Sequence, residues 1–242
     1  MIDTVMFDLD GTLLRFSQDV FLDAYLGELK KVFVKLDIDT ESAISAVLAG
    51  TKAMIANDGS MLNSKRFWDK FADSLALSNE RRKNIEAACD MFYLNEFNKV
   101  RSVVEPNDVP RRIVKELKTK GYSIVLATNP LFPACAVMTR LDWIGLTPWD
   151  FKHVTHYANC KYCKPNPEYY LEIFASIGKK PEQCLMVGNS PVDDMCVSLL
   201  GAETFLVTDY LENRTGVDIT AHRRGALTEL ESYLAALPVL KI

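Results

Sequence analysis

The chain has 242 residues, of which 48% are hydrophobic, and its formal net charge is -4. A chain of this size buries a full core in one large or two modest domains. The weak negative charge and the dispersed Lys and Arg residues argue against nucleic acid as a partner. No apolar run approaches the roughly 20 residues of a membrane span, and the N-terminus does not resemble a signal peptide. We therefore expect a cytoplasmic protein with no membrane partner, whose six cysteines are reduced.

The first informative feature is an apolar run, Val5 to Phe7, that leads into Asp8, Asp10 and a Gly-Thr turn. Short apolar runs are typical of buried parallel strands, and ligands bind at the carboxyl ends of such strands. Two close carboxylates repel each other unless a cation or a shared proton offsets their charge, and their hard oxygens suit Mg²⁺ bound with a phosphate. One Asp could attack phosphorus while the other protonates the leaving group and then activates water. The alternative is a strand that ends in a solvated Asp-Gly turn.

The next part of the chain has the periodicity of helices. Apolar residues recur at helical spacing over 20–36 and 85–97. No β-type run punctuated by turns occurs between Leu14 and Val104. Aromatic residues in this segment are expected mainly to form its core, with some of them able to face a cleft: Phe67, Trp68, Phe71, Phe92 and Tyr93.

Strands and helices alternate in the rest of the chain. Two helices are expected, each closed by a glycine and followed by a strand. These helices are 110–120 and 167–177, their glycines are Gly121 and Gly178, and the expected strands are 122–127, 184–187 and 204–207. The alternation predicts an α/β fold with a doubly wound parallel sheet.

The string DLDGTL at 8–13 resembles the first motif of the haloacid dehalogenase-like (HAD) superfamily, whose members are mostly Mg²⁺-dependent phosphatases. In that family an apolar strand ending in Ser or Thr, a Lys, and a strand ending in a Gly-Asp turn with further acids follow in order. The chain supplies Thr128 and Asn129 after its second strand, Lys164 at KPNPEYY, and GNSPVDD at 188–194. The resemblance therefore covers nearly the whole chain.

The resemblance implies a Rossmann-like parallel sheet with a helical cap domain inserted between the first two motifs. The catalytic core is expected at residues 1–15 and 105–242 and the cap at 16–104, with hinges near 14–17 and 103–110. Caps of this type occur in phosphatases that act on small molecules, so a small phosphorylated metabolite is the expected partner. No sequence feature indicates an oligomeric state.

Residue roles follow from the same resemblance. Asp8 is expected to be the nucleophile, and Asp10 the general acid and then the base, with its backbone carbonyl on the metal. The phosphoryl group is expected to be held by Thr128, Asn129 and Lys164. The Thr128 hydroxyl could instead form hydrogen bonds with local backbone groups. Without the resemblance, Lys164 would be interpreted as a solvated loop lysine. Because phosphoryl transfer needs a cation to offset charge, we prefer Lys164, and not Lys161, for this role.

Asn189 departs from the family pattern, in which an Asp at this position ligates Mg²⁺ directly. An amide oxygen is neutral, so metal affinity should fall unless Asp193 or Asp194 compensates, either directly or through bound water. The expected Mg²⁺ ligands are therefore Asp8, Asp10, Asn189, Asp193 and Asp194. The alternative is that the two acids simply begin a surface helix.

A competing metal hypothesis comes from the segment 153–163, which contains His153, His156, Cys160 and Cys163. These residue types form zinc sites, but structural zinc sites commonly separate their two ligand pairs along the chain. The same segment must also place Lys164 at the phosphate. Zinc is therefore the lesser hypothesis. A redox role for the CxxC is weaker still, because it does not follow a strand and open a helix.

The favoured function is a Mg²⁺-dependent phosphatase that hydrolyses a small-molecule phosphomonoester through an aspartyl-phosphate. Haloacid dehalogenases and phosphonatases of the superfamily lack the second Asp, so Asp10 argues against both activities. A sugar phosphomutase keeps both acids and is the nearest enzymatic alternative. Asn189 keeps open a further alternative, a non-catalytic phosphate-binding or regulatory protein with a degenerate site.

Overall fold

The computed structural model describes residues 1–240 and is built around a six-stranded parallel sheet in the order β3-β2-β1-β4-β5-β6. The strands are β1 (Thr4–Phe7), β2 (Ser123–Leu126), β3 (His153–Val154), β4 (Cys184–Gly188), β5 (Glu203–Val207) and β6 (Arg224–Gly225). The apolar run after the N-terminus becomes β1, which lies between β2 and β4. The predicted Rossmann-like fold is confirmed.

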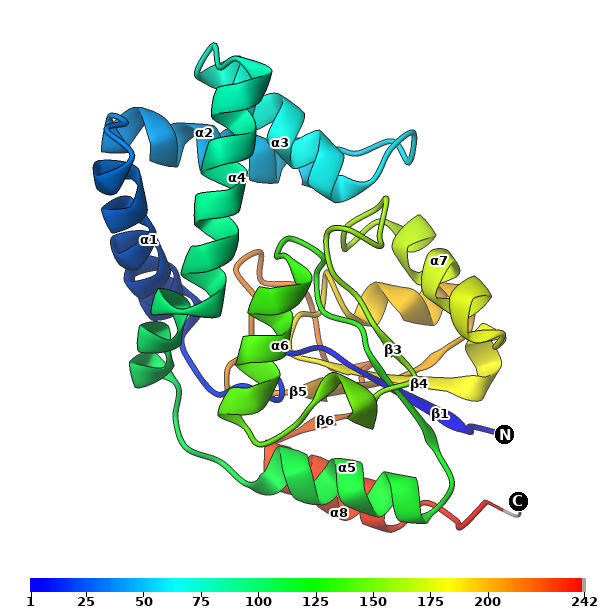
Figure 1. Cartoon of the computed structure of the whole chain (residues 1–242). Helices are drawn as coiled ribbons and strands as arrows, with labels where there is room; N and C mark the ends of the chain where they lie inside the picture. Colours follow the sequence, from blue (N-terminus) through cyan, green and yellow to red (C-terminus); the bar gives the residue numbers. More distant parts are fainter. Residues whose placement is uncertain (241–242) are drawn as a thin grey trace.

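Helices cover both faces of the sheet (Figure 1). In β1, Val5 and Phe7 belong to the core on one face, together with residues of α5 and α8, while Met6 belongs to the core on the other face, with residues of α7. Successive side chains of a strand point to opposite faces, which explains this alternation. The helices that flank the sheet are α5 (Val109–Thr119), α6 (Ala134–Trp143), α7 (Pro167–Ile177), α8 (Leu227–Ala235) and the 3₁₀ segments Pro148–Asp150, Pro181–Gln183 and Met195–Leu200.

A helical segment, residues 18–103, lies beside this sheet (Figure 1). It consists of α1 (Gln18–Lys35), α2 (Thr40–Ile55), α3 (Asn63–Ser74), α4 (Asn79–Leu94) and the 3₁₀ helix η1 (Glu96–Val103). Its interior is aromatic, as expected: Phe97 is fully buried and packs against Tyr25, Phe92 and Tyr93. The division of the chain at residues 16 and 104 stays a prediction.

The two connections to the helical segment pair with each other. Arg15 and Glu105 form an antiparallel bridge, in which the Glu105 amide donates to the Arg15 carbonyl at 2.8 Å. Their side chains also form an ion pair, with Arg15 Nε 3.1 Å from Glu105 Oε2. The chain therefore leaves and re-enters the sheet region at one place.

Several elements were not predicted from the sequence. The strands β3 and β6 have two residues each, which is too short for any periodicity to be visible. The helices α2 and α3 lie in the segment that was expected to be helical, although their bounds were not predicted, whereas α6 and α8 were missed. Among residues 1–240, no helix is both long enough and apolar enough to cross a membrane.

Candidate active site

The predicted site residues meet at the carboxyl edge of the sheet. Asp8 follows β1, Thr128 lies just beyond β2, and Asn189 follows β4. The ladder continues up to this edge, since the Asp8 amide donates to the Val187 carbonyl at 2.8 Å. One cavity of about 160 Å³ is lined by all eight predicted residues, Asp8, Asp10, Thr128, Asn129, Lys164, Asn189, Asp193 and Asp194.

Lys164 is the cation of this cavity, and its side chain is almost completely buried. Its Nζ donates to Asp8 Oδ1 at 2.8 Å and to Asp194 Oδ1 at 2.6 Å. Burial alone would lower the pKa of Lys164, but the carboxylates of Asp194 and Asp8 outweigh burial and raise it. Lys164 is therefore positively charged beside Asp8, whereas Lys161 does not line the cavity.

The two neighbouring acids of the 188–194 turn have different surroundings. Both oxygens of Asp194 are engaged, Oδ1 by Lys164 and Oδ2 by the Ser190 amide at 2.9 Å. Asp193 faces the cavity, and burial raises the pKa of its carboxyl; the charge of Lys164 opposes this shift, and the charges of Asp8 and Glu212 add to it. Among residues 1–240, Asp193 forms no ion pair, whereas Asp194 is paired with Lys164.

Asn189 connects the turn that follows β1 to the segment that follows β5. Its Nδ2 donates to the Tyr210 carbonyl at 2.6 Å, and its Oδ1 accepts from the Thr12 hydroxyl at 3.2 Å. A carbonyl can only accept a hydrogen bond, so the contact with Tyr210 fixes which way the amide points. Gly11 has φ +74°, and a Cβ there would lie 2.2 Å from Asn189 Nδ2, which explains the glycine.

The donor set of the cavity fits Mg²⁺ by type. Carboxylates of Asp8 and Asp193 and the amide oxygen of Asn189 are hard oxygen ligands, and Mg²⁺ usually keeps several waters beside them. The raised pKa of Asp193 reflects burial and crowded negative charge that a cation would relieve. Within residues 1–240, no group of three or more His, Cys, Asp or Glu side chains is placed so that it could hold a metal ion by itself.

Arg140 is a site residue that the sequence analysis missed. It lies on α6, is fully buried, and donates to Asp10 Oδ2 through Nη1. Its guanidinium also lies over the Phe132 ring, 4.4 Å from the centroid. Arginine is mostly exposed in proteins, and nothing in the pattern around residue 140 marks it as buried.

The carboxyl group of Asp10 is held on one side only. Arg140 engages Oδ2, while Oδ1 is buried and accepts no hydrogen bond from residues 1–240. Burial raises the pKa of Asp10; Arg140 opposes this shift and the charge of Asp8 adds to it. The geometry leaves one oxygen of a protonatable carboxyl available to a ligand.

Two residues of the zinc hypothesis, Cys163 and His156, have separate protein partners. Cys163 Sγ lies 3.3 Å from Asn63 Nδ2, and His156 Nδ1 accepts from the Ala158 amide at 3.2 Å. Burial raises the pKa of the Cys163 thiol to about 12, so the thiolate needed for zinc is disfavoured. The arrangement does not support a zinc site, and all six cysteines are free.

This segment instead holds the start of α3. The amides of Asn63 and Ser64 donate to the carbonyls of Cys160 and Tyr157 at 2.9 and 2.8 Å. The first amides of a helix have no partner within the helix, so these carbonyls satisfy them. The segment that leads to Lys164 is therefore also the contact between the sheet region and α3.

The Asn189 contacts generate a stability prediction. Asn189→Asp replaces the donor to Tyr210 by an oxygen that repels the carbonyl, so the free energy of unfolding should fall by about 1–3 kcal/mol in metal-free buffer. Urea denaturation in EDTA measures this change. Asn84→Asp, on the exposed side of α4, is the control and should shift the midpoint little. Equal midpoints for both variants would show that the Tyr210 contact does not hold Asn189.

Comparisons with known proteins agree with this geometry. The model of the haloacid dehalogenase-like hydrolase family matches residues 2–195. Pyrophosphatase PpaX of Bacillus cereus is 21% identical over 99% of this chain and 96% of its own length. A 2-haloacid dehalogenase from Pseudomonas syringae superposes with a TM-score of 0.64 at 18% identity, covering 97% of this chain and 99% of that chain. The HAD-hydrolase YfnB of Bacillus subtilis, bound to magnesium, gives a TM-score of 0.57 at 19% identity, covering 97% and 99%. With the family model matching most of its length, the chain belongs to the haloacid dehalogenase-like hydrolases.

Proposed function

We propose that the protein is a Mg²⁺-dependent phosphatase that hydrolyses a small-molecule phosphomonoester through an aspartyl-phosphate on Asp8. The observation that carries this proposal is the placement of Lys164 Nζ 2.8 Å from Asp8 Oδ1, in the cavity that Asp10 also lines. A cation beside a carboxylate nucleophile offsets the charge that both the nucleophile and the phosphoryl group bring.

In the first step, a carboxylate oxygen of Asp8 attacks phosphorus and the bond to the leaving oxygen breaks. Lys164 and the polar groups of Thr128 and Asn129 line the cavity where the phosphoryl oxygens would lie. Asp194 holds Lys164 in place, and for this reason we assign it a positioning role and not direct metal ligation.

Asp10 acts on the leaving group. Its raised pKa favours the protonated form, and its free Oδ1 can donate the proton to the departing alcohol. As a carboxylate it then takes a proton from the water that attacks the aspartyl-phosphate. Arg140, which engages only Oδ2, would keep Oδ1 directed at the reacting groups throughout.

Mg²⁺ would be held by Asp8, the Asp10 carbonyl, Asn189 and Asp193. When bound, it would neutralise charge on the phosphoryl oxygens and on Asp8. The magnesium-bound structural neighbour supports this part of the proposal.

The nucleophile can be tested by a nearly isosteric change. Asp8→Asn removes the attacking charge, so phosphate release from p-nitrophenyl phosphate should fall at least about 1000-fold relative to the unmodified protein. EDTA should abolish release by the unmodified protein, and Mg²⁺ should restore it. Turnover that survives either treatment would contradict the mechanism. Binding of phosphate by the unmodified protein without turnover would instead support the degenerate-site alternative.

A second test concerns the pH dependence that Arg140 imposes through Asp10. With an alkyl phosphate, Asp10 must be protonated, so kcat/KM should fall as pH rises through the pKa of Asp10. Arg140→Met removes a charge that lowers this pKa, and the alkaline limb should therefore move to higher pH.

Two controls accompany this measurement. Arg140→Lys keeps a positive charge and should move the limb less. The good leaving group of p-nitrophenyl phosphate needs little protonation, so its profile should not show the shift. If the alkaline limb of the kcat/KM profile lies at the same pH in the unmodified protein and in both Arg140 variants, Arg140 does not act on Asp10.

A further inference from the structure

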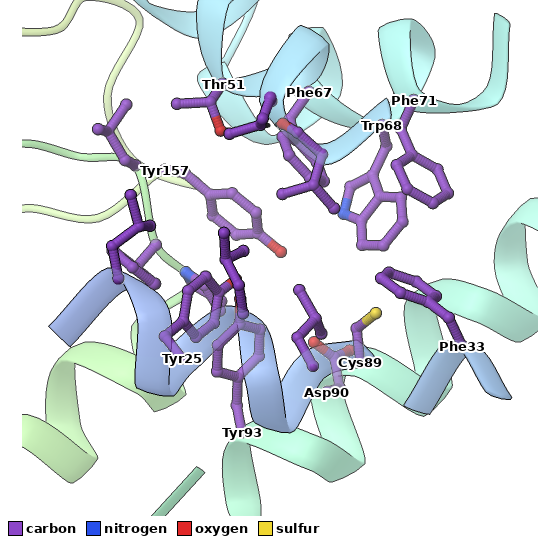
Figure 2. A pocket seen from close by; sticks show the side chains of 18 of the residues that line it. Tyr25, Phe33, Thr51, Phe67, Trp68, Phe71, Cys89, Asp90, Tyr93 and Tyr157 are labelled. Atoms are coloured by element: carbon purple, nitrogen blue, oxygen red, sulfur yellow. Dashed lines mark hydrogen bonds between the residues drawn. The ribbon is translucent and has the colours of Figure 1, made fainter. Parts of the chain in front are cut away.

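A second cavity, of about 250 Å³, lies between the helical segment and the sheet region (Figure 2). Its walls come from α1 to α4, from residues 131–133 and from Tyr157. It shares three lining residues, Gln18, Leu131 and Phe132, with the cavity that contains Asp8. The two cavities therefore adjoin each other along these three residues.

The walls of this cavity, which include the Asp90 carboxylate, select against anionic and polyhydroxylated groups. They are mostly apolar and aromatic, and no Lys or Arg occurs among the described lining residues. Tyr25 and Tyr93 hydrogen-bond to each other through their hydroxyls at 2.6 Å, and the Thr51 hydroxyl donates to the Val47 carbonyl at 3.0 Å. A second phosphate, a carboxylate or a sugar ring would therefore lose water contacts without enough replacements.

One polar group in the cavity does lack a partner. Trp68 is 5% exposed, and its Nε1 is buried and donates to no acceptor among residues 1–240. The indole lies near the Tyr157 hydroxyl but makes no hydrogen bond of acceptable geometry with it. Both groups point toward the middle of the cavity in Figure 2. Since a buried donor normally has an acceptor, the Trp68 N–H is available to an acceptor atom of a ligand.

We propose that this second cavity binds the leaving-group alcohol of the substrate. The alcohol is an apolar, preferably aromatic body, with a hydrogen-bond acceptor at the end that reaches Trp68. This inference rests on the phosphatase function proposed above and names the substrate class for the same site. It places small polar esters, bisphosphates and sugar phosphates among the poor substrates.

Matched alkyl esters test the proposal, because the leaving oxygens of 3-phenylpropyl phosphate and propyl phosphate have similar basicity. We expect kcat/KM for 3-phenylpropyl phosphate to be on the order of 100-fold higher, since even one methylene in an apolar pocket is worth 10-fold or more. A ratio near one, with both esters hydrolysed, would overturn the inference alone. No hydrolysis of these esters or of acetyl phosphate would overturn the phosphatase function and the inference with it.

A filling variant locates the preference in this cavity. Val47→Phe adds a ring at a buried lining position of α2, whereas Val34→Phe makes the same change at an exposed position of α1 outside the cavity. The phenylpropyl to propyl ratio should fall at least about tenfold in the first variant and stay unchanged in the second. The ratio cancels any general loss of activity. An unchanged ratio in a folded Val47→Phe protein would overturn the assignment.

Trp68→Phe tests the polar contact. It keeps an aromatic ring but removes the indole N–H, and the readout is the preference for 3-(4-hydroxyphenyl)propyl phosphate over 3-phenylpropyl phosphate. We expect the unmodified protein to prefer the hydroxylated ester and Trp68→Phe to lose that preference. No preference in the unmodified protein, or an equal preference in the variant, would overturn the acceptor contact with Trp68.

Discussion

The ion pairs of Lys164 are the constraint on which the site depends. A buried ammonium group and two buried carboxylates are each costly to remove from water, and only good mutual geometry offsets that cost. Lys164 Nζ lies 2.8 Å from Asp8 and 2.6 Å from Asp194, so removal of any one partner leaves a charge without a counterion. The parallel sheet provides this geometry, because Asp8 and Asp194 follow the adjacent strands β1 and β4.

The backbone near this cluster is shaped to fit it. A Cβ on Gly188 would lie 2.2 Å from the Asp194 carboxyl carbon, so the last residue of β4 must be glycine for Asp194 to fold back over the strand end. Asp194 in turn accepts from the Ser190 amide, which closes the turn on itself. The glycine therefore serves the placement of Lys164, although it carries no chemistry of its own.

The sequence predicted that the side chains of the site would meet, because a simple geometric rule applies to them. Residues that follow parallel strands meet at one edge of the sheet, so Asp8, Thr128 and Asn189 could be placed together without knowledge of the packing. No such rule applies to Arg140. Its burial depends on how α6 packs against Asp10 and Phe132, and helical periodicity gives the buried face of a helix but not the group that this face contacts.

The second cavity was unpredictable for the same reason. Its walls combine side chains of four helices and two separate loops, and the aromatic residues were expected from the sequence mainly as core. Trp68 and Phe71 are indeed buried, but they also enclose space, which composition cannot distinguish from close packing. Likewise, the CxxC segment is docked on α3 through backbone carbonyls, which leave no signal in residue type.

That docking joins the two halves of the proposed substrate site. The segment 157–164 satisfies the first amides of α3, provides Tyr157 to the wall of the second cavity, and ends at Lys164. If the helical segment moved away from the sheet, the α3 amides would lose their acceptors and the cavity would lose a wall together. The group proposed to hold the phosphate and the walls proposed to hold the alcohol are therefore brought into place by one contact, and a substrate that fills both cavities would stabilise it.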